Sequence, residues 1–283
     1  MTDGSDAASA GWFADVIPGD TEATTEAITG GRAEEPREWP RLAVEAGYAD
    51  SEREYYERLH DATMRAARTE IRRRERADDK QLIHAVRAMD DCERVGNELA
   101  ERVAEWAGSR LDDSGTGVAY ARELADSEAD SIEDGRLHSL ARRVRDLDEE
   151  ATSLRSHIER TAPQLAPNLA ALAGPVLAAR LIALAGGLKQ LARKPAGTVQ
   201  VLGAEEALFA HLRGQAPSPK HGVIFTHEAV RGTAPEHRGS AARALAGKLA
   251  IAARIDHYSG DRRPELETEL RERIERIQAR DVE

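Results

Sequence analysis

The residues best suited to chemistry lie within residues 219–260, where glycine repeatedly stands beside a basic residue. Lys220, His221 and Gly222 form a basic turn, and Arg238 and Gly239 stand at the start of a predicted helix. Glycine lets the backbone approach a phosphate closely, while lysine, arginine and histidine supply charge and planar stacking faces. A helix start also offers free N–H groups to an anion. The stretch indicates a site for RNA or another phosphate ligand, with surface loops of a helical domain as the alternative.

Several side chains in and near this stretch have a competing structural explanation. His227 follows an apolar run and is suited to stacking on a base, but a hydrogen-bonded structural histidine is the alternative. Arg243 and Lys248 lie on a predicted helix, where surface ion pairs are the alternative. Arg180 and Arg254 lie in apolar helices, so we expect structural roles for them. The residues we assign to RNA contact are Lys220, His221, His227, Arg231, Arg238, Arg243 and Lys248.

Motifs of catalysis and metal binding are missing from the sequence. It has no G-x-x-x-x-G-K-S/T phosphate loop, no G-x-G-x-x-G, no G-x-S-x-G and no H-E-x-x-H. A single cysteine, Cys92, excludes an internal disulfide and cysteine-rich zinc sites. We therefore predict no catalytic residue, no metal, no cofactor and no enzymatic activity. The weaker alternative is a phosphate-using enzyme built on residues 203–214, or a metal hydrolase. Its candidate metal ligands are His211, His221, His227 and His237.

Charge is distributed unevenly along the chain of 283 residues, which has 40 Lys and Arg, 51 Asp and Glu and a net charge of −11. Residues 163–260 hold 11 Lys and Arg against 5 Asp and Glu. A basic segment inside an acidic protein hints at a local anion-binding face. The acidic, Lys-poor composition is also typical of proteins kept soluble in high salt, which weakens phosphate contacts. We find no secretory signal and no apolar run of membrane-spanning length, and expect a soluble cytoplasmic protein.

Two long helices are predicted in the middle of the chain. Residues 79–107 show an amphipathic helical pattern, and a second helix is predicted over residues 120–160. Two such helices joined by a short polar turn form an antiparallel pair. Apolar residues of the second helix recur at steps of three and four, as in a coiled coil. The pattern leaves open whether this seam packs within the chain or against a second copy; we assign it to homodimer formation. The seam residues are Leu137, Leu140, Val144, Leu147, Leu154 and Ile158.

The remaining sequence predicts shorter elements. Pro163 and Pro167 are expected to end the second long helix, and residues 165–258 to form a compact stretch of short helices. Within it, residues 199–202 and 222–226 are candidates for extended structure. A last amphipathic helix is predicted over residues 265–280. We therefore expect a short N-terminal region without a core-sized apolar pattern (1–75), a coiled-coil hairpin (76–162), a globular domain (163–260) and a C-terminal helix (261–283).

Three segments resemble a known family. Residues 166–214 and 219–260 resemble the Nop domain. This domain occurs in the core scaffold protein of archaeal box C/D small ribonucleoproteins and in a related spliceosomal factor. Residues 78–108 resemble the first coiled-coil helix of the same family. The motifs that carry the resemblance are Ala166–Pro167–Asn168–Leu169, Gly174–Pro175, Ala179–Arg180–Leu181–Ile182, Leu202–Gly203–Ala204–Glu205, Lys220–His221–Gly222, His227 and Ala253–Arg254–Ile255–Asp256.

The resemblance implies a mainly α fold, with a long antiparallel coiled-coil hairpin, a compact helical Nop domain and a small N-terminal region. It implies a hairpin that forms a dimer, and a Nop domain that docks on a kink-turn RNA already held by a ribosomal-type kink-turn protein. It also implies an N-terminal domain that binds fibrillarin, the methyltransferase that carries the catalytic residues and S-adenosylmethionine. The chain would then organise RNA-guided 2′-O-methylation of rRNA or tRNA. The alternatives are a spliceosomal-type RNA-binding module and a coiled-coil interaction protein without RNA contact.

Three positions depart from the family pattern. Glu206 stands where a basic residue usually follows Gly-Ala-Glu, Ala210 where an arginine is common, and Ser240 where a lysine is common. Each loss weakens attraction to phosphate, so we expect the RNA share of binding to be smaller and the protein share larger. The N-terminal region is also shorter than the family's fibrillarin-binding domain.

Overall fold

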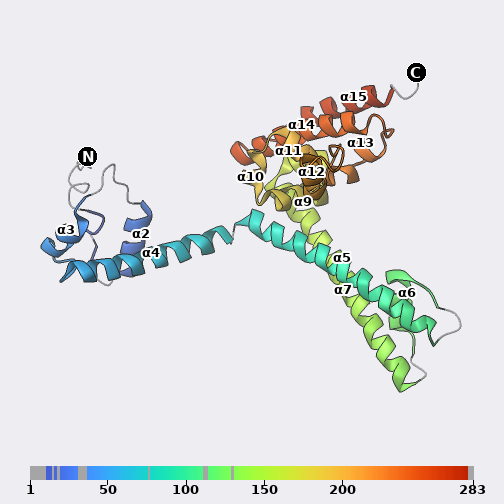
Figure 1. Cartoon of the computed structure of the whole chain (residues 1–283), viewed down its shortest axis with the longest axis horizontal. Helices are drawn as coiled ribbons and strands as arrows, with labels where there is room; N and C mark the ends of the chain where they lie inside the picture. The colour runs from blue at the N-terminus through green and yellow to red at the C-terminus, as the bar shows by residue number, and fades with distance from the viewer. Residues whose placement is uncertain are drawn as a thin grey trace. The chain divides into compact units, whose positions relative to one another are not determined.

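The computed structural model describes residues 11–14, 16–17, 20–30, 37–75, 77–110, 114–128 and 131–279 (Figure 1). Every regular element within these residues is a helix, which confirms the mainly α prediction. The chain divides into two units, Met1–Ala77 and Asp78–Glu283, and each unit has a hydrophobic core of its own.

The first unit is held by a small aromatic core. The rings of Phe13 and Tyr48 stack with centroids 5.4 Å apart, and Tyr55 meets Phe13 edge-on at 6.0 Å. Trp12 Nε1 donates a hydrogen bond to the Tyr55 hydroxyl at 3.2 Å. Aromatic rings bury much apolar area per residue, so a segment without helical apolar periodicity still forms a core. Its helices are α2 (Thr21–Gly30), α3 (Trp39–Glu45) and α4 (Glu52–Glu75).

The start of α4 is fixed by reciprocal capping. The Ser51 hydroxyl accepts a hydrogen bond from the Glu54 backbone N–H at 3.2 Å. The Glu54 carboxylate accepts one from the Asp50 N–H at 2.7 Å, one residue earlier than in the usual capping box. The hydrogen bond from the Asp50 N–H lowers the pKa of Glu54 most, and the hydrogen bond from Arg58 lowers it further. Ser51 is therefore the N-cap of α4.

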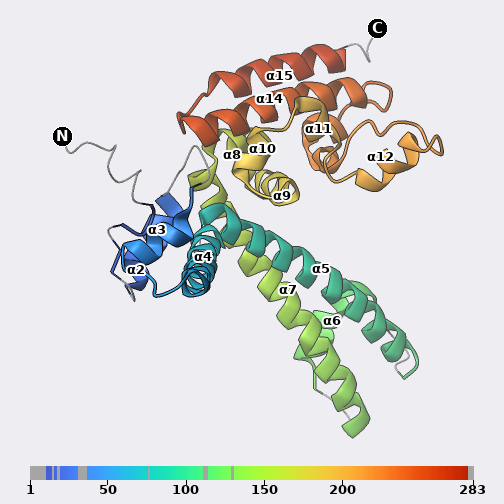
Figure 2. The same ribbon diagram turned by 60° about the vertical axis from the view of Figure 1, so that its left-hand side comes forward.

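The second unit begins with a helical hairpin. Its two long helices, α5 (Asp78–Gly108) and α7 (Ile132–Leu165), lie side by side (Figures 1 and 2). A short helix between them in sequence, α6 (Gly117–Asp126), packs on both. The prediction of one continuous helix over residues 120–160 is therefore wrong. Ser127 has an extended backbone, and Ser131 starts a new helix by accepting a hydrogen bond from Asp134 N–H at 3.1 Å.

The sequence predicted that Pro163 and Pro167 would end this helix. Pro163 instead lies in the last turn of α7, whereas Pro167 follows directly after the C-cap Ala166. Proline removes one backbone donor, but the residues after it still pair. The Ala166 N–H donates to the Ala162 carbonyl at 2.9 Å and closes the turn. The helix therefore extends to Leu165.

The coiled-coil seam of α7 packs within the chain. Apolar neighbours of the seam include Val103 of α5 and Leu124 of α6. A Cβ built on Gly96 of α5 would lie 3.7 Å from the Cβ of Leu147, so Leu147 covers this glycine. The seam thus has its partner in the same chain, and the assignment of these residues to a dimer stays a prediction. Leu137, Val144 and Ile158 are buried, and Leu140, Leu147 and Leu154 are partly buried.

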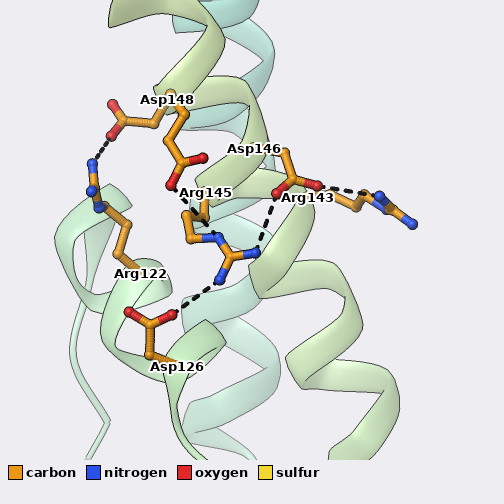
Figure 3. Close-up of polar contacts among 7 residues, drawn as sticks. Arg122, Asp126, Arg143, Arg145, Asp146 and Asp148 are labelled. Atoms are coloured by element: carbon orange, nitrogen blue, oxygen red, sulfur yellow. Dashed lines mark hydrogen bonds and ion pairs between the residues drawn. The ribbon is translucent and has the colours of Figure 1, made fainter.

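Ion pairs also join α6 to α7. Arg145 of α7 pairs with Asp126 of α6 at 3.0 Å, while Arg122 of α6 pairs with Asp148 of α7. Arg145 lies between Asp126 and Asp146 in Figure 3. These side chains remain accessible to water, and exposed pairs contribute little because salt and water screen them. The apolar contacts of α6 must therefore supply most of its attachment.

The remainder of the second unit is a globular part built of short helices. They are α8 (Pro167–Ala173), α9 (Pro175–Ala185), α10 (Leu188–Ala192), α11 (Ala196–Val201), α12 (Glu205–Leu212), the 3-10 helix η1 (Val223–Thr226), α13 (Glu228–Arg231), α14 (Arg238–Tyr258) and α15 (Glu265–Gln278). α14 contacts α8, α10, α11, α13 and α15. Its buried face is mostly alanine, which lets neighbouring helices approach closely. The predicted last helix is confirmed as α15, and its four apolar residues join this core.

Two segments predicted to be extended are helical. Residues 199–202 lie mostly in α11, and residues 222–226 lie mostly in η1. Val199 and Ile224 are fully buried in the core around α14. Tertiary packing therefore overrode the strand preference of these β-branched and aromatic residues.

No single helix in the described part of the chain is long and apolar enough to cross a membrane. One bent pair, Pro167–Ala173 with Pro175–Ala185, meets that test of length and composition together, with a bend of 116°.

Candidate nucleic-acid interface

The backbone around Gly222 fixes the basic turn against α11. Gly222 N–H donates to the Gln200 carbonyl at 2.9 Å, and Val223 N–H donates to the Leu202 carbonyl at 2.8 Å. The Gln200 side-chain amide donates to the Lys220 carbonyl at 2.7 Å. A Cβ on Gly222 would lie only 2.1 Å from the Leu202 oxygen, so the close approach requires glycine. The turn therefore holds Lys220 and the residue after it in a defined position.

Two predicted contact residues, His221 and Arg238, contact one aromatic ring beside this turn, and a third, Lys220, lies next to them. His221 stacks on Phe225 with ring centroids 4.6 Å apart and planes 20° apart. The Arg238 Cζ lies 5.4 Å from the centroid of the same ring, in a cation–π contact. A Cβ built on Gly239 would lie 3.9 Å from three side-chain carbons of Lys220, so Lys220 lies along the start of α14. We call Lys220, His221, Phe225 and Arg238 the basic–aromatic cluster.

The charges of this cluster act on the His221 ring. Burial lowers the pKa of His221 from its ordinary value of 6.5, and the charges of Arg238 and then Lys220 lower it further. The ring is therefore neutral near pH 7 and offers a flat stacking face, while its two neighbours supply the positive charge.

The loop before α14 holds Arg238 in place. Its Nε donates to the Thr233 carbonyl at 3.0 Å, and its Nη2 lies 3.5 Å from the Arg231 carbonyl. Thr233 is itself buried, and its hydroxyl donates to the Ala229 carbonyl at 2.9 Å. Because the loop is anchored at both ends, the guanidinium is oriented before any ligand arrives.

The structure gives His227 a structural position. Its Nε2 lies 2.9 Å from the Leu172 carbonyl, and its Nδ1 accepts a hydrogen bond from the Ala229 N–H at 3.1 Å, which caps α13. Burial lowers the pKa of His227, partly opposed by the bond to Leu172. Both ring nitrogens are thus satisfied within the protein, which favours the structural explanation over base stacking.

The other three predicted contact residues differ in their surroundings. Arg231 is exposed and pairs with Glu228 at 2.8 Å. Lys248 pairs with Glu269 of α15, as the ion-pair alternative anticipated. Arg243 is exposed on α14 and has no ion-pair partner among the residues that the structure describes. Arg243 is therefore the most available of the three.

Arg180 and Arg254 have the structural roles that we expected. Arg180 pairs with Asp90 of α5 and so ties the globular part to the hairpin. Arg254 Nε donates to the Ala192 carbonyl at the end of α10, at 3.2 Å. A positive charge near the last carbonyls of a helix is favourable.

Sequence reasoning missed the buried pair that positions the globular part. Asp256 of α14 accepts hydrogen bonds from the backbone N–H groups of Asn168 and Leu169, at 3.0 and 2.8 Å, and so caps α8. The Asn168 side-chain amide also donates to Asp256 at 2.7 Å, while its oxygen accepts from Arg263 N–H at 2.6 Å. Isolated polar residues in apolar helices were the available signal.

The positions that depart from the family pattern lie on exposed or half-buried surface. Glu206 is exposed on α12, whereas Ala210 of α12 and Ser240 of α14 are half-buried. No residue of α12 is buried, and Phe209 and Leu212 are 59% and 71% exposed. This helix therefore offers apolar rather than basic surface.

The histidines considered as metal ligands serve other contacts. His211 Nδ1 lies 3.0 Å from the Ala216 carbonyl, His221 stacks on Phe225 and His227 caps α13. The described residues contain no group of three or more His, Cys, Asp or Glu side chains that could hold a metal ion.

Comparisons with known proteins identify a family and several relatives that this chain is similar to. A family model described as "Nop: snoRNA binding domain, fibrillarin" matches residues 78–279. An uncharacterized NOP5 family protein of Methanocaldococcus jannaschii is 34% identical over 274 residues, which cover 84% of this chain and 66% of that protein. Nucleolar protein 56 of Pongo abelii is 31% identical over 250 residues, which cover 74% of this chain and 42% of that protein.

A solved structure shares the fold. The crystal structure of a fibrillarin/Nop5p complex includes a chain that matches with a TM-score of 0.55 and 25% identity, over 89% of this chain and 91% of that one. The chain spans less than two thirds of the length of the two relatives named above. The family model nevertheless covers more than half of the chain, and the chain therefore belongs to the Nop family.

Proposed function

We propose that this chain is a non-catalytic scaffold of an archaeal-type box C/D ribonucleoprotein. It binds kink-turn RNA together with a ribosomal-type kink-turn protein, and it recruits fibrillarin for RNA-guided 2′-O-methylation of rRNA or tRNA. Membership of a family described as snoRNA-binding supports the RNA partner, and the likeness to a chain from a fibrillarin/Nop5p complex supports the protein partner.

The basic–aromatic cluster is the observation that carries the RNA part of this proposal. Arg238 lies over the Phe225 ring, and the charge of Lys220 acts on His221, which stacks on the same ring. Two positive charges thus flank a pair of stacked rings, in a chain with a net charge of −11. Single-stranded nucleotides are bound by such combinations, because cations attract the phosphates while flat rings stack on bases.

The residues have different roles in this proposal. Lys220 and Arg238 contact phosphate, and His221 and Phe225 form the stacking face. Arg231, Arg243 and Lys248 extend the positive surface around them. His227 orients the loop from Leu172 instead of touching RNA, since its two nitrogens are already bonded.

The protein partners complete the proposal. The first unit binds fibrillarin, which carries the catalytic residues and S-adenosylmethionine, so the chain itself is not an enzyme. A homodimer places two such units on one particle. Since Glu206, Ala210 and Ser240 reduce phosphate attraction, the kink-turn protein supplies a large share of the affinity.

A gel-shift titration tests the RNA part. The full chain is added to a kink-turn RNA, with and without the kink-turn protein, at about 0.2 M and about 1 M KCl. We expect a supershift only when the kink-turn protein is present. Lys220→Glu and Arg238→Glu should each weaken it about tenfold or more, since each replaces an attraction to phosphate by a repulsion.

Arg142→Glu is the matched control, because Arg142 is an exposed arginine of the hairpin, outside the cluster. It should leave the supershift unchanged. An equal supershift for all four proteins would contradict RNA contact by the cluster and favour a coiled-coil interaction protein without RNA contact.

A further inference from the structure

A groove between α14 and α15 carries positive charge beyond the basic–aromatic cluster. The two helices pack side by side (Figure 2) and enclose a groove of about 460 Å³. Its uncharged lining includes Gly247 and Ile251, which is 39% exposed. Four basic side chains line it, namely Arg243, Lys248, Arg273 and Arg276, against the two carboxylates of Glu269 and Glu272.

Among the described residues, Lys248 is the one of these four cations that has an ion-pair partner. Lys248 pairs with Glu269, and Arg276 uses its Nε to donate to the Glu272 backbone carbonyl at 3.1 Å. Arg243 and Arg273 have no ion-pair partner among the residues that the structure describes. Guanidinium groups left exposed and unpaired are well suited to bind phosphate through two parallel hydrogen bonds.

The groove is continuous with the cluster along one face of α14. Gly239, which Lys220 covers, precedes Arg243 by four residues, and Gly247 follows after four more. Residues four apart on a helix lie on one face, about 6 Å apart along its axis. Lys220, Arg243 and the groove therefore follow each other along that face, at spacings close to the separation of neighbouring phosphates in an RNA strand.

We infer that the groove between α14 and α15 binds the phosphodiester backbone of the RNA strand that continues past the basic–aromatic cluster. Arg243 and Arg273 contact phosphate oxygens, Arg276 adds charge, and Gly247, which has no side chain, leaves room for the strand. This inference rests on the proposed function, because the cluster sets where the strand enters the groove. RNA is favoured over an acidic protein segment as the occupant, because the positive charge of the groove continues the face that we propose to bind RNA.

The test measures the salt dependence of binding. The probe is a kink-turn RNA with an extended flanking stem, already bound by the kink-turn protein, and the full chain is titrated by fluorescence anisotropy between about 0.1 and about 0.5 M KCl. The double variant Arg273→Ala/Arg276→Ala should bind about tenfold more weakly. The magnitude of the negative slope of log K against log salt should also fall by about one to two. Each lost phosphate contact removes about 0.9 from that magnitude.

Arg271→Ala is the matched control, because Arg271 is exposed on the same helix but lines a different groove. It should leave both affinity and slope unchanged. An unchanged slope for the double variant, with weakened binding by Arg238→Glu, would overturn the groove inference and leave the proposed function standing. An unchanged slope for both variants would overturn the proposed function as well. Loss of fibrillarin capture with an unchanged RNA slope would assign the groove to a protein and overturn the RNA assignment.

Discussion

At the scale of single residues, Asp256 is the buried acceptor on which the start of α8 depends. Only 8% of Asp256 is exposed, and its two oxygens receive three N–H donors from Asn168 and Leu169. Asp256→Asn places an amide against those donors, so one or more buried N–H groups lose their partner. We expect the free energy of unfolding to fall by about 2–4 kcal/mol, measured by denaturant unfolding.

Asp261→Asn is the control for this prediction. The Asp261 side chain is exposed, and only its backbone carbonyl is bonded to Asn168. Its replacement should change stability by no more than about 0.5 kcal/mol. Equal losses in the two variants would contradict the capping role of Asp256.

A second prediction at this scale concerns pH. Burial lowers the pKa of His227 below its ordinary value of 6.5, so the unfolded chain binds a proton before the folded chain does. The contribution of His227 to stability is therefore fully present above pH 6.5, and it is lost as the pH falls below that value. The slope from this group is at most about 1.4 kcal/mol per pH unit. Unfolding curves taken at successive pH values measure it.

His227→Asn separates this effect from other titrations. Asparagine keeps an acceptor for the Ala229 N–H at the start of α13, but it does not titrate. The variant should lose stability above neutral pH, because the bond to Leu172 is gone, and should show a shallower slope below pH 6.5. Identical slopes in the two proteins would show that His227 is not the group responsible.

Sequence reasoning reached only part of the site at this scale. Lys220, His221 and Arg238 were found because each lies beside or near a glycine that permits close backbone approach. Phe225, the ring that contacts both His221 and Arg238, was missed because it lies within an apolar run. The structural role of His227 depends on Leu172, which lies 55 residues earlier, and no local pattern reports a contact of that range.

At the scale of elements, the first turn of α5 caps two helices of the globular part. The Asp79 carboxylate accepts a hydrogen bond from Leu188 N–H at 3.2 Å, at the start of α10. The Lys80 ammonium donates to the Gly186 carbonyl at 3.0 Å, at the end of α9. A negative group thus meets a helix N-terminus and a positive group meets a helix C-terminus, which is the favourable pairing in both cases.

This arrangement predicts that Asp79 and Lys80 stabilise the junction of α9 and α10. In Asp79→Ala/Lys80→Ala, amide hydrogen exchange in α10 should accelerate about tenfold, which corresponds to about 1.4 kcal/mol of local stability. Exchange in the centre of α14 should not change. Asp78→Ala, an exposed change in the same turn, is the control. Unchanged exchange in α10 would show that packing alone holds the junction.

The elements also show why some sequence predictions were confirmed and others were wrong. The repeat of apolar residues every 3.5 positions in α7 identified the seam correctly. Such a repeat places the apolar side chains on one face of the helix, and that face packs on any partner helix. The pattern does not distinguish a partner helix of the same chain from one of a second copy. The break between α6 and α7 was missed because Ser127 and Ser131 lie within an otherwise helical composition, where a single cap has a weak signal.

At the scale of the whole molecule, the chain consists of two units with separate cores. The aromatic core of the first unit involves residues between Phe13 and Tyr55, whereas the cores of the second unit involve residues between Leu82 and Ile277. The family model matches residues 78–279, which lie within the second unit. The proposed functions divide in the same way, with fibrillarin assigned to the first unit and RNA to the second.

This division predicts that residues 78–283 fold and bind RNA without the first unit. Among the described residues, the cores of the second unit take none from the first unit. The shortened chain should therefore unfold cooperatively, with the same midpoint as the corresponding transition of the full chain. The proposal assigns RNA to the second unit alone, so its supershift with kink-turn RNA and the kink-turn protein should require a concentration within about twofold of the full chain. Fibrillarin capture should be lost. Loss of the supershift from a folded chain of residues 78–283 would instead show that the first unit belongs to the RNA-binding surface, and retained fibrillarin capture would move that contact to the second unit.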